Sequence, residues 1–95
     1  MRVEILGDQI SSERDFHSQL ATALDVRRYY GHNLDALWDL LSASVERPVE
    51  IVWRDAAQSR ERLGEQFDKI VSVLERVRLQ DEQFGWTEKF TCSLE

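Results

Sequence analysis

The N-terminal part of the chain carries hydrophobic residues in two different periods. Val3 and Ile5 alternate with polar residues, which predicts a short first strand. Ser12-Glu13-Arg14-Asp15 has the form of a capping box, with aspartate in place of the usual glutamate, and predicts the start of a helix. The helix continues with hydrophobic residues about one turn apart, namely Phe16, Leu20, Ala23 and Leu24.

A second helix is predicted after a loop over residues 25–32. Asn33 is a residue type that is favoured at the N-cap, because its side chain can accept a hydrogen bond from a free backbone amide. Hydrophobic residues then follow at positions i, i+3, i+4 and i+7, namely Leu34, Leu37, Trp38 and Leu41. This stripe indicates a helix that turns one face toward a core.

The second half of the chain predicts a strand, two helices and a last strand. Residues 49–53, directly after Pro48, are rich in β-branched and aromatic residues, which favours a strand. Residues 54–62 predict a short polar helix. A longer amphipathic helix is indicated by Phe67, Ile70, Val71, Leu74 and Val77, and the alternation over residues 87–94 predicts the last strand.

Helices between successive strands favour crossover connections and therefore a parallel sheet. We expect an α/β fold in which a three-stranded parallel sheet packs against about four helices. A chain of 95 residues has the length of one domain, so residues 1–95 are expected to form a single unit. The final dipeptide, Leu94-Glu95, has the form of an expression-vector remnant.

The chain is acidic, and this narrows the classes of partner. It has 18 acidic against 12 basic residues and a formal net charge of −6. Such a charge disfavours direct binding to nucleic acid or to an anionic membrane. It favours encounters with a basic protein, although a mildly acidic balance also serves solubility alone.

Targeting and redox features are sparse. No apolar stretch of about 18 residues predicts a membrane span, and the N-terminus lacks the pattern of a signal peptide. The single cysteine, Cys92, cannot form an internal disulfide, which is typical of a cytoplasmic protein. No sequence motif indicates a cofactor.

Asp39 is the residue that local structure explains least well. It lies inside the predicted second helix, where aspartate is a mediocre helix former. It also follows Asp35 by four residues, a spacing at which like charges repel by about 0.2–0.5 kcal/mol. The two aspartates could form an ordinary solvated face. With Trp38 beside them, they could instead form a patch for a cationic partner.

His32 raises the question of catalysis, because it precedes a helix with two aspartates. A histidine beside carboxylates can serve acid–base chemistry or bind a metal. However, no metal-ligand spacing, nucleophile motif or glycine-rich phosphate loop accompanies it. We therefore favour a loop histidine that positions the chain, and expect neither an enzyme nor a metal site.

A long block of the sequence resembles the barstar family, whose members are intracellular protein inhibitors of bacterial ribonucleases. The resemblance runs from Ile5 to about Ser59 and continues more loosely to the C-terminus. Its most specific residues are Tyr29-Tyr30-Gly31, Asn33-Leu34-Asp35-Ala36-Leu37-Trp38-Asp39, Glu46, Pro48, Trp53-Arg54 and Gln58-Ser59.

The resemblance implies a small parallel sheet with four helices, and a function as a bacterial antitoxin-like immunity protein. In that family an acidic helix and the preceding loop block the nuclease active site. The partner-binding residues that it implies here are Tyr29, Asn33, Leu34, Asp35, Trp38, Asp39 and Glu46, with Asp39 at the centre. It also implies that the Arg47-Pro48 peptide bond can be cis, whereas the residues alone leave trans as the default. The alternative is a barstar-like interaction module whose partner is not a nuclease.

Two positions depart from the family pattern. The pattern has a second tryptophan after the acidic helix, where this chain has Ser44. It also has a glutamate on the last helix, where this chain has Arg76 with Glu75 beside it. An arginine that faced a basic nuclease would oppose binding, so the departure bears on the identity of the partner.

Overall fold

The computed structural model describes all residues 1–95, and its elements follow the predicted order. A 3₁₀ turn and a π-helical turn accompany four α-helices and three strands. The elements are β1 (Arg2–Leu6), η1 (Gly7–Gln9), α1 (Glu13–Leu24), α2 (Leu34–Asp39), η2 (Leu40–Ser44), β2 (Val49–Arg54), α3 (Ala56–Leu63), α4 (Glu65–Phe84) and β3 (Phe90–Leu94).

The three strands form one parallel sheet in the order β1-β2-β3, which confirms the predicted fold class. In the register, Ile5 lies opposite Trp53, and Trp53 lies opposite Leu94. The Glu95 N–H donates a hydrogen bond to the Trp53 carbonyl, and the Ala56 N–H donates one to the Glu95 carbonyl. The final dipeptide therefore takes part in the sheet and in the start of α3.

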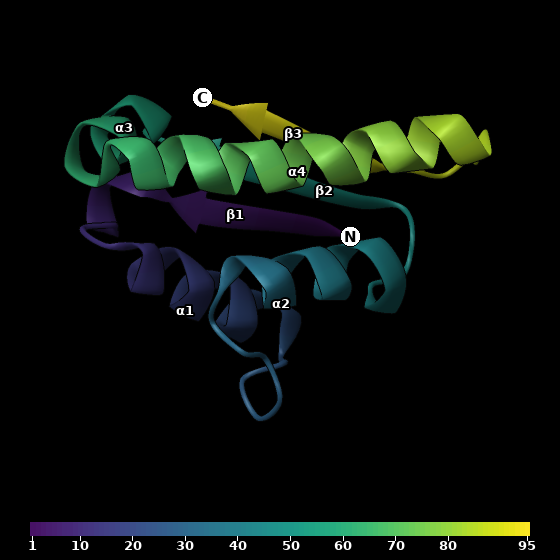
Figure 1. Cartoon of the computed structure of the whole chain (residues 1–95), viewed down its shortest axis with the longest axis horizontal. Coiled ribbons are helices and arrows are strands. Elements are labelled where there is room, and N and C mark those ends of the chain that lie inside the picture. Colours follow the sequence, from purple (N-terminus) through teal and green to yellow (C-terminus); the bar gives the residue numbers. More distant parts are fainter.

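Helices cover one face of the sheet. Figure 1 shows α4 lying along the sheet and running opposite to the strands, with α1 and α2 below it in this view. The side chains that point to the covered face are buried, among them Val3, Ile5, Ile51, Trp53 and Phe90. Trp53 stacks on Phe16 of α1 with ring centroids 4.8 Å apart and contacts Phe67 of α4 at 5.0 Å. This burial supplies the apolar contacts that hold the layers together.

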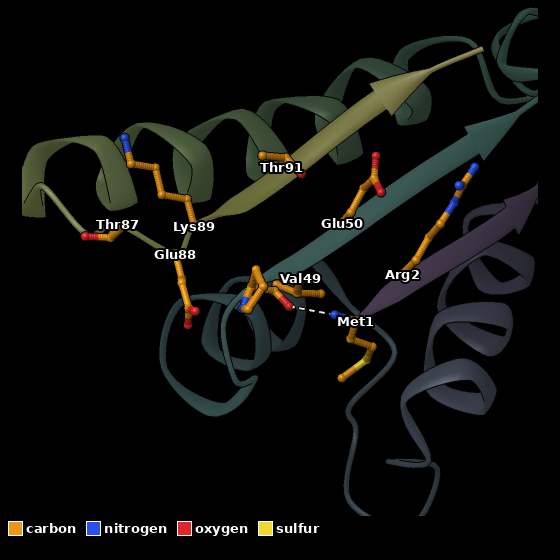
Figure 2. Close-up of a pocket in the computed structure, with 9 residues that line it drawn as sticks. Met1, Arg2, Val49, Glu50, Thr87, Glu88, Lys89 and Thr91 are labelled. Atoms are coloured by element: carbon orange, nitrogen blue, oxygen red, sulfur yellow. Dashed lines mark hydrogen bonds between the residues drawn. The ribbon is translucent and has the colours of Figure 1, made fainter.

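The other face of the sheet is mostly polar and has no helix over it, although Val52 on this face is buried. Arg2 lies opposite Glu50 in the register, Glu50 lies opposite Thr91, and all three are exposed. Figure 2 shows them at the N-terminal end of the sheet, near the hydrogen bond of 2.8 Å from the Met1 ammonium to the Pro48 carbonyl. Parallel sheets are usually covered on both faces, and the polar residues here keep this face soluble without a second layer.

Gly7 allows the end of β1 to pack closely against the end of β2. A Cβ at Gly7 would lie 2.2 Å from the carbonyl oxygen of Arg54, a distance that no side chain can occupy. The Ser59 hydroxyl, on α3, donates a hydrogen bond of 2.9 Å to the Gly7 carbonyl and accepts one of 3.0 Å from the Trp53 indole. The chain can therefore bury this polar backbone without an unpaired group.

Local signals place the helix starts correctly. Ser12 and Asp15 form the predicted capping box at the start of α1, and the Asn33 side chain accepts a hydrogen bond of 2.7 Å from the Ala36 N–H at the start of α2. Helix α1 ends at Leu24, and its C-cap residue, Asp25, has φ of +57°. An aspartate tolerates this left-handed conformation better than most residues, because its short polar side chain can bond locally.

The helix after Asn33 differs from the prediction beyond Asp39. Leu37 and Leu41 are buried as the stripe predicts, and Leu34 and Trp38 pack against the core while partly exposed. Leu40, which lies outside the predicted stripe, is buried beside Leu41. The burial of Leu40 coincides with the start of η2, since a π-helical turn holds more residues than an α-helical one and rotates the positions within it. The predicted stripe therefore omits Leu40.

Smaller differences occur in the second half. From α4, Val71 packs against the core but is only partly buried, whereas Val73, which was not predicted, is buried. Strand β3 begins at Phe90, later than residue 87. Arg60, Glu61 and Arg62 are exposed as expected of a solvated helix face, but Arg62 also donates a hydrogen bond of 2.6 Å to the Asp8 carbonyl. This bond ties α3 to η1.

A buried ion pair fixes the turn between η2 and β2. Arg47 donates hydrogen bonds of 2.7 and 3.0 Å to the two carboxylate oxygens of Asp81, whose side chain is fully buried on α4. The Phe90 N–H donates a third, of 2.7 Å, to Asp81. Burial acts to raise the pKa of this carboxyl, but the bonds from Arg47 and Phe90 outweigh it and hold the pKa below its usual value. The adjacent Arg47-Pro48 bond is cis, as the resemblance implied.

Candidate functional site

The loop before α2 is anchored to the core by a buried hydrogen-bond chain. His17 of α1 is fully buried, with Nδ1 2.6 Å from the Tyr30 hydroxyl and Nε2 2.9 Å from a Glu13 carboxylate oxygen. Tyr30 is itself buried. This explains His17 as a satisfied core histidine. It also fixes Tyr30 at the middle of the loop, which Figure 1 shows protruding beside α2.

The chemistry of the partners assigns the protons in this chain. A carboxylate can only accept, so His17 Nε2–H donates to Glu13, and Nδ1 accepts from the Tyr30 O–H. Burial lowers the pKa of His17, and the hydrogen bond and charge of Glu13 oppose this only in part. Burial also raises the pKa of Tyr30. Both groups therefore stay neutral at pH 7, which keeps the anchor intact.

Two further side chains shape the end of the loop. Asn33 Nδ2–H donates a hydrogen bond of 3.2 Å to the Gly31 carbonyl, while Oδ1 accepts the capping bond from Ala36. His32 has φ of +54°, and its Nδ1 lies 2.9 Å from the Tyr30 carbonyl. The structure thus uses His32 and Asn33 to turn the chain from the loop into α2.

The acidic face of α2 is exposed and carries free charge. Asp35 and Asp39 are both exposed, and neither takes part in any of the seven ion pairs of the molecule. Tyr29 is 73% exposed, the largest fraction of any large hydrophobic side chain. Tyr29, Asp39 and Ser44 share a hollow of about 170 Å³. The loop, the end of α2 and η2 therefore meet in one shallow depression around Asp39.

A second hollow lies between α2 and α4. It measures about 320 Å³ and contains Leu34, Asp35 and Trp38 from α2. Trp38 is partly buried against the core. The two hollows flank α2, so five of the seven predicted contact residues line them: Tyr29, Leu34, Asp35, Trp38 and Asp39.

The other two predicted contact residues, Asn33 and Glu46, line neither hollow. Glu46 is exposed beyond η2. Asn33 is exposed, but both polar atoms of its side chain bond to the chain's own backbone. Sequence reasoning assigned Asn33 to the contact set and to the N-cap, and the structure gives the N-cap role directly.

A further hollow lies away from α2. The largest hollow, about 680 Å³, lies at the open N-terminal end of the sheet, where Arg2, Glu50, Glu88 and Lys89 mix charges of both signs (Figure 2). No group of three or more histidine, cysteine or acidic side chains is arranged to hold a metal ion. Burial raises the pKa of the Cys92 thiol to about 11, so this cysteine is a weak nucleophile near neutral pH.

Comparison with known proteins agrees with the fold. A family model described as "Barstar (barnase inhibitor)" matches residues 1–94. The chain belongs to the barstar family. A protein of Bacillus subtilis (strain 168) named "Putative ribonuclease inhibitor YrdF" is 34% identical over 83 residues, which cover 85% of this chain and 91% of that protein. These findings point to an inhibitor rather than an enzyme.

Within this barstar-family fold the structure also resolves which residue of α4 meets α2. The Arg76 guanidinium carbon lies 4.5 Å from the centroid of the Trp38 ring, and Arg76 lines the second hollow. Glu75 is turned to Arg78 instead, with which it forms an ion pair. In the sequence, a shift of the alignment by one residue would place Glu75 instead of Arg76 at this position. No helix of the structure has the length and apolar character that crossing a membrane requires.

Proposed function

We propose that this protein is a cytoplasmic ribonuclease inhibitor that blocks the active site of a basic bacterial nuclease with α2 and the loop before it. The observation that carries the proposal is the carboxylate of Asp39. It is exposed at the end of a short, firmly capped helix, beside an exposed tyrosine, and no cation of its own chain pairs with it. Membership of the barstar family and the name of the B. subtilis relative support the same function.

The chemistry of ribonucleases explains why a carboxylate would serve. An enzyme that cleaves RNA must hold a phosphate with cationic donors such as arginine, lysine and histidine. A carboxylate accepts the same charge-assisted hydrogen bonds, and with arginine it forms a two-bond pair. Asp39 would therefore occupy the phosphate position, and Asp35 would add a second negative charge beside it.

The remaining contact residues would act around this centre. Tyr29 and Trp38 would supply aromatic surface, which often contributes much of the affinity at interfaces. Leu34 would add apolar contact, and Asn33 would hold the start of α2 in place. Glu46 would extend the acidic field that guides a basic partner to the site and speeds its association.

The test is a titration of the protein into barnase, the nuclease that the family description names, with RNA cleavage as the readout. We expect inhibition at stoichiometric amounts by the unaltered protein and its loss in Asp39→Ala. Glu50→Ala removes the same charge from the open face of the sheet and should inhibit like the unaltered protein. Inhibition that Asp39→Ala retains would contradict the proposed role of α2.

A different outcome would favour the second candidate, an interaction module whose partner is not a nuclease. The observation in its favour is the pair of departures, Ser44 in the hollow around Asp39 and Arg76 over Trp38. If the protein fails to inhibit barnase but binds, through Asp39, a basic protein that is not a nuclease, that candidate replaces the first.

A further inference from the structure

Helix α4 carries its basic residues in two different states. Arg78 forms ion pairs with both Glu75 and Glu82. Lys69 and Arg76 are exposed and form no ion pair. Eight of the twelve basic residues of the chain form no ion pair, and what distinguishes Lys69 and Arg76 among them is their common position on α4.

Both unpaired cations border the hollow between α2 and α4. They are seven residues apart, which is two helical turns or about 10 Å along one face. Arg76 lies over the face of Trp38, an attractive cation–π arrangement that leaves the guanidinium N–H groups free to donate. Arg76 therefore has a fixed position and unused hydrogen-bonding capacity.

The hollow has an apolar part as well as this charge. Leu34, Trp38 and the buried Val73 line it together with Lys69 and Arg76. Asp35 also lines it and offsets one of the two positive charges, so the hollow keeps a net positive charge. A short apolar stem that ends in a carboxylate would match both parts, with the stem against Trp38 and the oxygens on Arg76 and Lys69.

We propose that the hollow between α2 and α4 receives an aspartate or glutamate side chain of the partner nuclease, held by Arg76 and Lys69. The proposal rests on the proposed function and deepens it, because it divides the contact surface into an anionic half around Asp39 and a cationic half around Arg76. The partner then has a cationic cleft opposite Asp39 and an acidic residue on its rim.

The same residues select against other nucleases. A nuclease whose rim is cationic opposite Arg76 meets a like charge there, and like-charge contacts across an interface are costly. Arg76 thus acts as a specificity residue, while Asp39 serves nucleases with a phosphate-binding cleft in general.

The experiment uses barnase as the probe and compares Arg76→Glu with Arg2→Glu. Both variants change the net charge from −6 to −8, but Arg2 lies on the open face of the sheet, away from α2. Both arginines are exposed, and thermal unfolding checks that each variant folds. If barnase presents the cationic surface expected of an RNA-binding cleft, Arg76→Glu should inhibit it at least about tenfold more tightly than Arg2→Glu.

A second measurement tests the carboxylate directly. Barnase variants that each carry one Lys→Glu or Arg→Glu change on the rim of the cleft are titrated with the unaltered protein and with Arg76→Glu. We expect the unaltered inhibitor to bind at least one of these barnase variants about tenfold more tightly than it binds unaltered barnase. The Arg76→Glu inhibitor should show no such gain.

The outcomes distinguish a failure of the proposed carboxylate site from a failure of the proposed inhibitor function. Inhibition by the unaltered protein that Asp39→Ala abolishes, with Arg76→Glu equal to Arg2→Glu and no gain on any rim variant, would overturn the cationic half and leave the proposed function standing. No inhibition by any of these proteins would contradict both.

Discussion

Asp39 and Asp81 are both aspartates within helical segments, and the structure treats them in opposite ways. The side chain of Asp81 is fully buried and accepts two hydrogen bonds from Arg47 and one from the Phe90 N–H. Asp39 is exposed and has no ion pair. One aspartate is matched by the chain itself, and the other is left unmatched.

The difference shows how to separate charges that serve folding from charges that are available to a partner. A buried carboxylate is tolerated only when its own chain satisfies it, because desolvation of an unpaired charge is costly. A carboxylate that water solvates can remain unmatched until a partner arrives. The same contrast separates Arg78, which is paired, from Arg76, which is not.

The largest effect on stability should come from removing the buried carboxylate of Asp81. Asp81→Ala leaves the mostly buried Arg47 without its counter-charge, and the loss of one partner of a buried pair typically costs about 3–5 kcal/mol. Urea denaturation at pH 7 measures the free energy of unfolding. Asp39→Ala is the matched control and should change it by no more than about 0.5 kcal/mol. Equal effects of the two variants would remove the distinction between them.

A second prediction concerns the exposed carboxylates of α2 and the rate at which a nuclease associates with them. If the exposed carboxylates steer a basic nuclease, the association rate constant with barnase should fall by about ten- to a hundredfold between low and high salt, while the dissociation rate constant changes little. Stopped-flow fluorescence at several salt concentrations measures both. A salt-independent association rate would show that the acidic face does not guide the encounter.

A smaller effect is expected from the buried anchor of the loop. Burial lowers the pKa of His17 in the folded state, whereas in the unfolded chain the pKa is about 6.5. Below about pH 6.5 the unfolded chain therefore binds more protons at His17 than the folded protein does. The stability from His17 is therefore complete above about pH 6.5 and is lost as the pH falls toward the folded pKa, with a slope of at most about 1.4 kcal/mol per pH unit.

Urea denaturation between pH 5 and 7.5 tests this, with His17→Gln as the comparison. The variant keeps hydrogen-bonding groups near Tyr30 and Glu13 but cannot titrate, so its stability should depend less on pH across this window. A variant with the same slope as the unaltered protein would assign the pH dependence to other groups.

Much of the fold could be predicted from the sequence, because local signals and the tertiary structure agree. The capping box at Ser12, the cap at Asn33 and the β-branched run after Pro48 all mark elements that the structure contains. The π-helical turn could not be predicted in this way. It depends on how η2 packs Leu40 and Leu41 into the core, and hydrophobic spacing alone does not specify it.

The candidate site was predictable in part. The poor fit of Asp39 to its helix is visible in the sequence alone, and a local inconsistency of this kind is expected at functional positions. The anchoring of Tyr30 by His17 and the stacking of Arg76 on Trp38 were not predictable, because each joins residues far apart in the sequence. The absence of an ion pair at Lys69 likewise could not be predicted, because it depends on the positions of all neighbouring acidic residues.

The central claim is that the charge of Asp39 serves a partner and not the fold, and one variant tests it most directly. Asp39→Asn keeps the shape of the side chain and removes only its charge. Its binding to barnase and its melting temperature are measured beside those of Glu50→Gln, which makes the same change on the open face of the sheet. We predict a roughly 30-fold or greater loss of affinity, about 2 kcal/mol or more, for Asp39→Asn alone, with both melting temperatures unchanged. Unaltered affinity, or a clear fall in the melting temperature of Asp39→Asn, would contradict the account.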